Sequence, residues 1–184
     1  MNPLWFSLVV PAAMLVWGAW TFNRLVALRN RLREAWSGID VQLKRRHSLV
    51  PTLVACVEGY RGHERALFER VAQARAAAQC AHGAEQVRAA ENELARGLRQ
   101  LVVLAEAYPQ LKAAESYLAL GRQLVEIEDQ IQYARRYYNG SAAILNNAIE
   151  SFPSLLIARV FGFKRVEFWE VESALDRAAP EVRL

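Results

Sequence analysis

The chain has 184 residues, of which 23 are Lys or Arg and 19 are Asp or Glu, so its formal net charge is +4. The basic residues are interleaved with the acidic ones rather than gathered into a stripe, which argues against a nucleic-acid-binding protein. The two cysteines lie outside any metal-ligand spacing, which indicates ordinary reduced thiols.

The first apolar run of the chain predicts a transmembrane helix. Residues from Leu4 to Phe22 include no charged side chain, and roughly 20 helical residues span about 30 Å, the thickness of a bilayer's hydrocarbon core. Trp5 and Trp20 lie at opposite ends of the run, where aromatic rings favour the headgroup layers. We therefore expect a membrane anchor over residues 1–23, with both tryptophans at its interfaces.

A cleaved signal peptide is the competing interpretation of this run. Such peptides carry a basic segment, a shorter apolar core and small residues at the cleavage site. Here Met1-Asn2-Pro3 contributes only the α-amino charge, and the run ends in the bulky residues Trp20-Thr21-Phe22. These features favour a retained anchor over a cleaved peptide.

Charges beside the run predict its orientation. No Lys or Arg precedes it, whereas Arg24, Arg29, Arg31 and Arg33 follow it directly. By the positive-inside rule, the amino end faces out and the body lies in the cytoplasm. Attraction to the anionic leaflet then predicts headgroup contacts for Arg24 and Arg29.

Beyond the anchor, apolar periodicity predicts helices. Over residues 24–46 apolar residues recur at steps of three and four, so the anchor continues without a break into the body. Pro51 lacks an N–H and disfavours helical backbone before it, which predicts a chain reversal and a second helix over residues 49–80. A proline kink without reversal is the alternative. Gly59 and Gly62 indicate a local distortion of this second helix.

Two further helices complete the prediction. The third runs over residues 84–107 between Gly83 and Tyr108-Pro109, and the fourth begins near Leu111 and reaches Asn139-Gly140, with a continuation to Glu150 left open. Matched helices with short connections predict an all-α antiparallel four-helix bundle over residues 24–151.

Four antiparallel helices, joined by three chain reversals, predict that residues 152–169 return to the membrane. This segment combines aromatic and aliphatic side chains with a few basic ones, a composition typical of interfacial segments. The alternatives are that it closes the end of the bundle or docks on another subunit. The polar tail is expected over residues 170–184. The side chains expected at the membrane interface or on anionic headgroups are Phe161, Phe163, Trp169, Arg159, Lys164 and Arg165.

The histidines do not form a metal motif. Di-iron bundles need Glu-x-x-His on two helices, but the residues three before the histidines are Lys44, Tyr60 and Gln79. No His-Glu-x-x-His sequence and no glycine-rich phosphate loop is present. We therefore expect no catalytic residue, no cofactor and no metal.

Two clusters that contain acidic residues are expected to be structural rather than catalytic. The cluster from Glu126 to Asp129 is expected to form a solvated or ion-paired face near Arg135-Arg136 or Arg45-Arg46. His63-Glu64 could act as a proton-transfer pair in an enzyme, but helix packing and surface pairing are favoured.

Several blocks of sequence follow one another from the end of the apolar run to about Phe168. They are residues 22–26, 36–46, 49–54, Gly59-Tyr60, His63-Glu64, Ala74-Arg75, 108–113, 128–131, 134–139, Asn146 and 152–154. These blocks, in this order, resemble the LemA family. Phe22 stands where the family usually has Tyr, and the lipid-attachment Cys of some relatives is missing.

The resemblance implies a helical bundle held by an N-terminal membrane segment, with the bundle in the cytoplasm and no established catalytic activity. The first hypothesis is a non-enzymatic scaffold or adaptor at a bacterial inner membrane, with the lipid bilayer, further copies of itself or other membrane proteins as partners and no nucleic acid. The second is lipid binding or membrane remodelling through residues 152–169.

Overall fold

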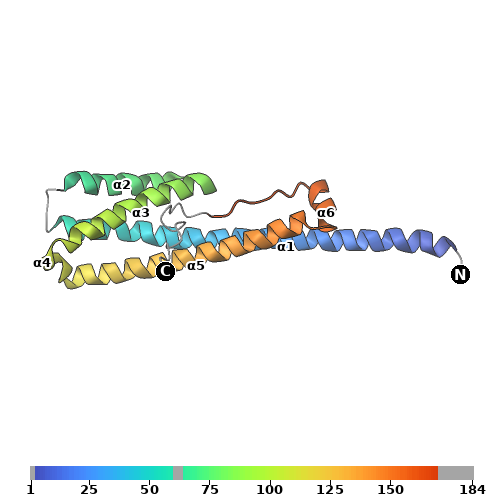
Figure 1. The fold of residues 1–184 in the computed structure, drawn as a ribbon, viewed down its shortest axis with the longest axis horizontal. Helices are drawn as coiled ribbons and strands as arrows, with labels where there is room; N and C mark the ends of the chain where they lie inside the picture. Colours follow the sequence, from blue (N-terminus) through green and yellow to red (C-terminus); the bar gives the residue numbers. More distant parts are fainter. Residues whose placement is uncertain (1–2, 60–63, 170–184) are drawn as a thin grey trace, which may run out of the picture. The chain divides into compact units, whose positions relative to one another are not determined.

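The computed structural model describes residues 3–59 and 64–169, with side chains from residue 9 onward. The predicted all-α class is confirmed, since this part of the chain includes no strand. The helices in chain order are α1 (Pro3–Glu58), α2 (Arg65–Cys80), α3 (Ala84–Glu106), α4 (Pro109–Lys112), α5 (Glu115–Glu150) and α6 (Ser154–Val160) (Figure 1).

The chain divides into two compact units. Unit 1 comprises residues 1–41 and 131–168, and unit 2 comprises residues 42–130 and 169–184. The long helices α1 and α5 each contribute one part to unit 1 and the other part to unit 2.

Unit 1 is built on an antiparallel pair, the first part of α1 and the second part of α5. The rings of Trp36 and Tyr138 meet edge-on with centroids 5.6 Å apart. Earlier in α1, Phe22 meets Phe161, which follows α5, so sequence numbers rise on one side as they fall on the other. The buried apolar residues of this pair are Leu25, Leu32, Ala35, Ile39, Ile131, Tyr138, Ala142, Leu145 and Ile149.

The described part of unit 2 contains five helical segments: the end of α1, α2, α3, the short α4 and the beginning of α5. Arg46 on α1 meets Glu128 on α5, and α2 runs antiparallel to α3, where the nearest Val71 atom lies 3.0 Å from the position of a Cβ on Gly97. This arrangement agrees with the predicted antiparallel bundle. The core residues are Val50, Leu53, Val57, Phe68, Val71, Ala78, Leu94, Leu98, Leu101, Ala105 and Leu111.

The predicted chain reversal at Pro51 is wrong. Helix α1 continues through Pro51 to Glu58, and α2 begins only at Arg65. The predicted second helix over residues 49–80 therefore divides into the end of α1 and the separate helix α2. The chain reverses after Gly59, one of the two glycines expected only to distort that helix.

A side chain from α2 explains why the helix survives the proline. Pro51 has no N–H to donate to the carbonyl of His47, four residues earlier. Instead, Arg75 Nε donates to His47 O at 2.7 Å. The hydrogen bond from the Arg75 guanidinium thus replaces the missing helical hydrogen bond, and α1 continues as a helix past Pro51.

The predicted fourth helix is also divided differently. Tyr108-Pro109 ends α3 as expected, but the short helix α4 intervenes and places Leu111 in the core. Helix α5 then runs unbroken through Gly140 to Glu150, which resolves the continuation left open by the sequence.

Candidate functional site

The amino-terminal part of α1 exposes its apolar side chains. Within the described residues, α1 is the helix long and apolar enough to cross a membrane, and little of its apolar stretch is buried in protein. Met14, Leu15 and Val16 are each about 70 % exposed. Side chains of this kind at such exposure fit contact with lipid.

Helix α6 packs against the last turns of this apolar stretch. The Cδ1 atom of Ile157 lies 3.7 Å from the position of a Cβ on Gly18, so the absent side chain leaves room for α6 beside α1. Farther along, the ring centroid of Phe22 lies 4.6 Å from that of Phe161 and 6.0 Å from that of Phe163. The segment after α5 therefore lies at the end of the apolar stretch, as the even number of predicted antiparallel helices requires.

The outer face of α6 is apolar and open. Leu156 and Val160 lie four residues apart on α6, hence on one side of the helix, and are 53 % and 78 % exposed. Phe152 precedes α6 and Phe161 follows it, and these rings are 80 % and 56 % exposed. Four large apolar side chains on so short a segment form an exposed patch of the kind that marks a protein or membrane contact. We call these four residues the α6 face.

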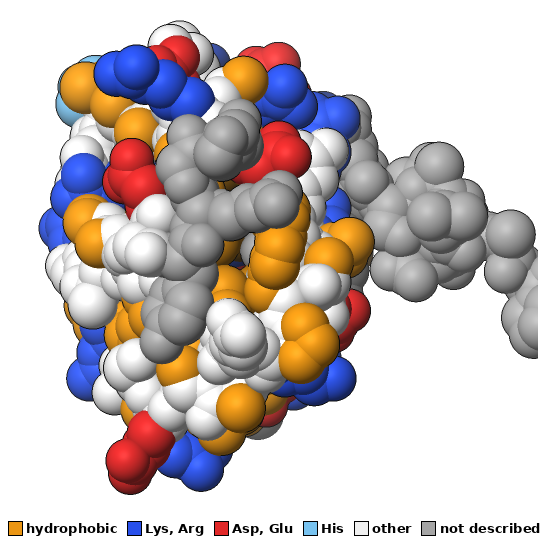
Figure 2. Space-filling view, turned by 90° about the vertical axis from the view of Figure 1, so that its left-hand side faces the viewer, with side chains coloured by type: hydrophobic (Ala, Val, Ile, Leu, Met, Phe, Trp, Pro, Cys, Tyr) orange, Lys and Arg blue, Asp and Glu red, His pale blue; other side chains and the backbone are white. Residues whose placement is uncertain are grey.

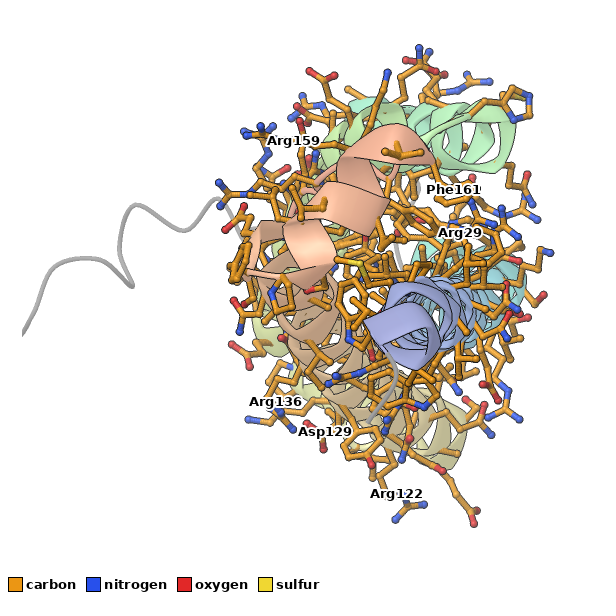
Figure 3. All side chains as sticks on the ribbon, turned by 90° about the vertical axis from the view of Figure 1, so that its right-hand side faces the viewer. Arg29, Arg122, Asp129, Arg136, Arg159 and Phe161 are labelled. Carbon is orange, nitrogen blue, oxygen red and sulfur yellow. The ribbon has the colours of Figure 1, made fainter. Side chains whose placement is uncertain are left out.

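Basic side chains accompany this aromatic cluster. The guanidinium of Arg24 lies over the ring of Trp20 at 5.7 Å, and that of Arg29 lies over Phe163 at 5.1 Å. In the view toward the amino-terminal end of α1, Arg29 and Phe161 lie on one side of α6 and Arg159 on the other (Figure 3). Arg165 lies 3.7 Å from a carboxylate oxygen of Glu150, and Lys164 is exposed.

The stretch after α6 is fixed to α5 by polar contacts. The amide of buried Asn146 donates to the carbonyl of Val166 at 2.8 Å and accepts from its N–H at 2.9 Å. The hydroxyl of Tyr138 donates to the carbonyl of Glu167 at 3.3 Å. These bonds hold the extended backbone in place beyond Phe163.

A cavity of about 290 Å³ lies beside Trp20 and Arg24. Its walls come from one segment of α1 and from the end of α5 with the following turn. The lining residues are Trp17, Trp20, Thr21, Arg24, Leu25, Ala148, Ser151, Phe152, Pro153 and Ser154.

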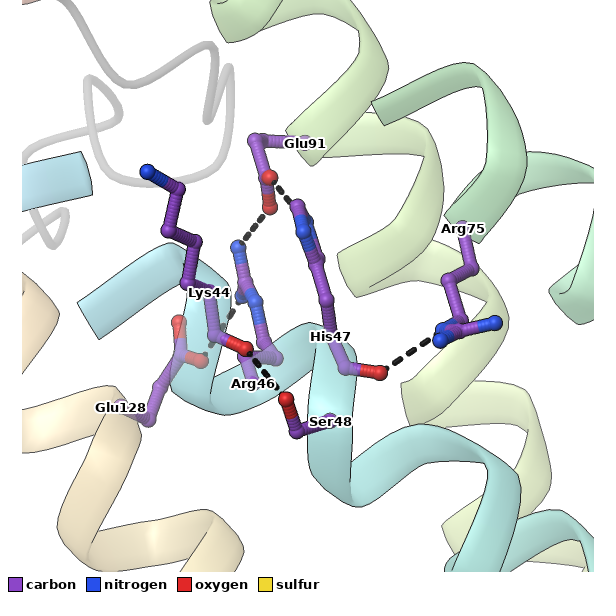
Figure 4. Close-up of polar contacts among 7 residues, drawn as sticks. All are labelled: Lys44, Arg46, His47, Ser48, Arg75, Glu91 and Glu128. Carbon is purple, nitrogen blue, oxygen red and sulfur yellow. Dashed lines mark hydrogen bonds and ion pairs between the residues drawn. The ribbon is translucent and has the colours of Figure 1, made fainter. Parts of the chain in front are cut away.

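A separate cluster of charges is buried in unit 2 (Figure 4). Arg46 is fully buried and pairs with Glu91 on α3 and, at 2.9 Å, with Glu128 on α5. Nε2 of His47 lies 2.6 Å from the other oxygen of Glu91. We call Arg46, His47, Glu91 and Glu128 the buried polar cluster.

The environment of Glu91 keeps its carboxylate charged. Burial raises the pKa of this group, but the hydrogen bond with His47 and the charge of Arg46 outweigh burial. As a result, the pKa of Glu91 lies below its ordinary value of 4.5. The charge on Arg46 is thus compensated inside unit 2.

The family comparison matches most of the chain. The model of the LemA family matches residues 35–184. The chain belongs to the LemA family. The matched range includes the buried polar cluster and α6 but begins after the α1 wall of the cavity.

The similarity to individual relatives covers a shorter part of the chain than the match to the family model. The chain is 36 % identical over 87 residues to the magnetosome protein MamQ of Magnetospirillum gryphiswaldense, covering 47 % of this chain and 32 % of the relative. It is 31 % identical over 94 residues to the magnetosome proteins MamQ 1 and MamQ 2 of Paramagnetospirillum magneticum, covering 51 % of this chain and 35 % of each relative. The chain thus spans about a third of the length of the curated relatives it matches. Family and apolar helix together support a membrane-associated LemA-type protein.

The structure places the predicted membrane residues of this LemA protein unequally. The rings of Phe161 and Phe163 pack against Phe22. Trp20 carries the guanidinium of Arg24, and Phe163 carries that of Arg29. Trp169 is only 3 % exposed, so its ring is covered by protein and does not join the exposed α6 face. The side chain of Trp5 lies outside the described side chains.

Sequence reasoning missed the buried polar cluster of this LemA protein, although a signal existed. Arg46 lies three residues after Leu43 in the apolar stripe, and Glu91 lies three residues before Leu94. Charged residues at core positions of two helices indicate a buried pair. The acidic cluster of α5 meets the Arg45-Arg46 pair, one of the two partners expected for it, through the contact of Arg46 with Glu128.

No other candidate chemistry gathers in the described part of this LemA protein. It contains no group of three His, Cys, Asp or Glu side chains that could hold a metal ion. At the helix ends of unit 2, basic and acidic side chains are interspersed with hydrophobic ones (Figure 2). Of the predicted His63-Glu64 pair, His63 lies outside the described residues.

Proposed function

We propose that this LemA-family protein is a membrane-anchored, non-enzymatic scaffold or adaptor, with its amino end outside and its body at the cytoplasmic face of a bacterial inner membrane. The observation that carries the proposal is the continuity of α1 from the apolar stretch into the bundle. An unbroken helix joins the anchor to the body without an intervening loop. Arg24, Arg29, Arg31 and Arg33 support the orientation.

Assembly with further copies or with other membrane proteins is part of this proposal. Tyr133 and Ile144 on α5 are 64 % and 47 % exposed, and Gly140 lies between them with open space around it. This surface of unit 1 suits contact with another helix.

Cysteine labelling in cells tests the orientation. With Cys56 replaced by Ser, the exposed Cys80 should react with a membrane-impermeant maleimide only after spheroplasts are lysed. The matched control is Asn2→Cys in a chain with Cys56 and Cys80 replaced by Ser, which should react in intact spheroplasts. Reaction of Cys80 before lysis would contradict the orientation. A strictly monomeric protein with no crosslinked partner in mild detergent would contradict the scaffold role.

A second candidate function is lipid binding or membrane remodelling through residues 152–169. It is favoured by the exposure of the α6 face beside the last turns of the apolar stretch. In water this face leaves four large apolar side chains solvated, whereas in the headgroup layer they are buried, which is favourable by roughly 25 cal/mol per Å².

An environment-sensitive fluorophore distinguishes these situations. In the full chain without native cysteines, a label at Val160→Cys should report an apolar environment in phosphatidylglycerol vesicles. The control label at Arg99→Cys on α3 should report water. Identical, water-like signals from the two positions would exclude insertion of the α6 face.

A further inference from the structure

The part of α5 that belongs to unit 1 carries a stripe of exposed residues. Tyr133, Tyr137 and Ile144 are 64 %, 40 % and 47 % exposed, and Gly140 and Asn147 are exposed as well. These five residues follow one another at steps of four, three, four and three. Helical residues at such steps share one side of the helix. We call them the α5 stripe, and it lies on the opposite side of α5 from the buried residues of that helix.

The spacing of the α5 stripe is that of a coiled-coil seam. A seven-residue repeat relates Tyr133 to Gly140 and Asn147, and it relates Tyr137 to Ile144. Such a repeat lets two helices pack side by side at about 20° with interlocking side chains. At the centre of the stripe, no atom lies within 4 Å of the position of a Cβ on Gly140. A second helix can therefore come close at this point.

The composition of the α5 stripe suits contact with an identical stripe. None of its five residues is charged. In a parallel two-fold pair each of them meets its own counterpart, so that Tyr133 meets a tyrosine, Ile144 an isoleucine and Asn147 an amide that both donates and accepts. One repeat earlier on α5 stands Glu126, which would face an identical charge. The self-match therefore covers residues 133–147, about 21 Å of helix at about 1.5 Å per residue.

One ring of the stripe is already held in position by α1. Arg31 Nε donates to the hydroxyl of Tyr137 at 3.3 Å, and its guanidinium lies 5.8 Å from the centroid of the ring. The ring keeps 40 % of its surface exposed in this position. A side chain that is fixed before contact loses less conformational freedom when a partner binds.

We propose that two copies of this chain pair in parallel through the α5 stripe. The inference rests on the proposed membrane anchoring, because two copies anchored by α1 in one bilayer point the same way and hold identical residues at the same height. A different protein has no such reason to match the stripe residue by residue. Anchoring in one bilayer also raises the effective concentration of the two stripes, so a contact smaller than a standard interface is sufficient.

Disulfide formation in native membranes tests the pairing. In the full chain with Cys56 and Cys80 replaced by Ser, Tyr133→Cys and Ile144→Cys should each give a covalent dimer on mild oxidation, because equivalent positions lie opposite each other. The matched control is Arg136→Cys, an exposed position on the same helix beside the stripe (Figure 3), which should stay monomeric. If the helices paired antiparallel about Gly140, chains with Tyr133→Cys would link to chains with Asn147→Cys, and that result would overturn the parallel arrangement.

A charge at Gly140 tests the contact at a position with open space around it. Gly140→Glu, made in the Ile144→Cys chain, should lower the crosslinked fraction about tenfold or more, because two like charges then face each other. Gly121→Glu is the matched control, since a Cβ there also meets nothing within 4 Å and the residue lies off the stripe; it should crosslink like the parent. Co-expression of Gly140→Glu and Gly140→Lys chains should restore the crosslink, which a merely unfolded variant could not do.

Two outcomes would overturn the pairing: no covalent dimer from either stripe cysteine, or as much dimer from Arg136→Cys as from Ile144→Cys. Neither outcome decides the proposed function, because the labelling of Cys80 reports the orientation of the anchored chain independently. A crosslink from the stripe to a different protein would replace the second copy as the occupant and still support the scaffold.

Discussion

In unit 2 the fully buried Arg46 has two carboxylates within hydrogen-bonding distance, whereas in unit 1 the buried hydroxyl of Thr21 has no partner in the described residues and the α6 face leaves large apolar groups open. The buried charges of unit 2 are therefore paired within the unit, although Arg46 Nε and Gln42 Oε1 have no hydrogen-bond partner in the described residues. Unit 1, by contrast, exposes apolar side chains of the kind that are buried when a protein contacts lipid or another protein. The contrast teaches that function is better sought in what a region leaves unpaired than in its most conspicuous charges, since buried pairs are often structural.

Removing Glu91 should have the largest effect on stability. Glu91→Ala leaves Arg46 and His47 buried beside a cavity, and breaking a buried pair in this way costs about 3–5 kcal/mol. Denaturant unfolding of the full chain in detergent, followed by circular dichroism, measures the loss. The control Glu93→Ala breaks an exposed pair with Arg96 and should change stability by less than about 1 kcal/mol. Equal effects of the two variants would show that the buried polar cluster is not special.

Acid should produce a smaller version of the same loss, because a protonated Glu91 can still form hydrogen bonds. Its folded-state pKa is lower than the ordinary value of 4.5, so its contribution is present above pH 4.5 and is lost as pH falls through the folded-state pKa. The stability difference between the wild type and Glu91→Gln should therefore be constant near neutral pH and shrink below pH 4.5. A difference that stays constant down to pH 3 would refute this account.

Replacing Arg75 should have an intermediate effect. Arg75→Met keeps much of the aliphatic stem but leaves the carbonyl of His47 without a donor, which costs about 1.5–3 kcal/mol for a bond from a charged group. Arg70→Met is the matched control, since its contact to Gln100 is exposed and 3.4 Å long. If the two variants unfold at the same denaturant concentration, Arg75 does not support the helix at Pro51.

Two helical glycines should respond with opposite signs. A Cβ on Gly97 would lie 3.0 Å from Val71 Cγ2, and a valine in a helix has little freedom to rotate away. Gly97→Ala should therefore destabilise unit 2, with overpacking of about 1–3 kcal/mol opposed by the better helix propensity of alanine. Gly121→Ala meets nothing within 4 Å and should stabilise by about 0.5–1 kcal/mol. Thermal unfolding of both variants checks the signs; stabilisation by Gly97→Ala would contradict the close approach of α2 and α3.

The smallest change in stability is expected on the α6 face. Leu156→Ser and Val160→Ser alter exposed positions, so the free energy of unfolding in detergent should shift by no more than about 0.5 kcal/mol. A label at Phe161→Cys in the same chains should nevertheless move from an apolar toward an aqueous environment in phosphatidylglycerol vesicles. A large stability loss in detergent would instead assign these residues to a protein interior.

The sequence predicts the helices better than their connections. The stripe from Leu25 to Leu43 identifies α1 because periodicity is a local property, and Tyr108-Pro109 marks a true helix end for the same reason. Pro51 misleads, because the compensating donor, Arg75, lies on another helix, 28 residues after the His47 carbonyl that it serves. Sequence rules account for the hydrogen bond that a proline removes, but not for a replacement bond donated by a side chain far along the chain.

The candidate site was predictable to a similar extent. Aromatic and basic composition indicates residues 152–169 as a membrane segment, and Phe161 and Phe163 do lie against α1. The same composition gives no sign that Trp169 is buried while Phe152 is open. The burial of the Thr21 hydroxyl depends on which surfaces of α1 and α5 meet. Contacts between residues more than 120 positions apart cannot be predicted from local sequence patterns.

The bond from Arg75 to the carbonyl of His47 makes two positions epistatic. While Pro51 is present, loss of Arg75 leaves an orphaned carbonyl; once Pro51 is replaced by alanine, the restored N–H serves that carbonyl and Arg75 can vary with little penalty. The order of substitution therefore matters. If Pro51 is replaced first, the later loss of Arg75 changes stability little. If Arg75 is replaced first, the intermediate protein is less stable. Part of the mutational history available to this helix is set by a single hydrogen bond.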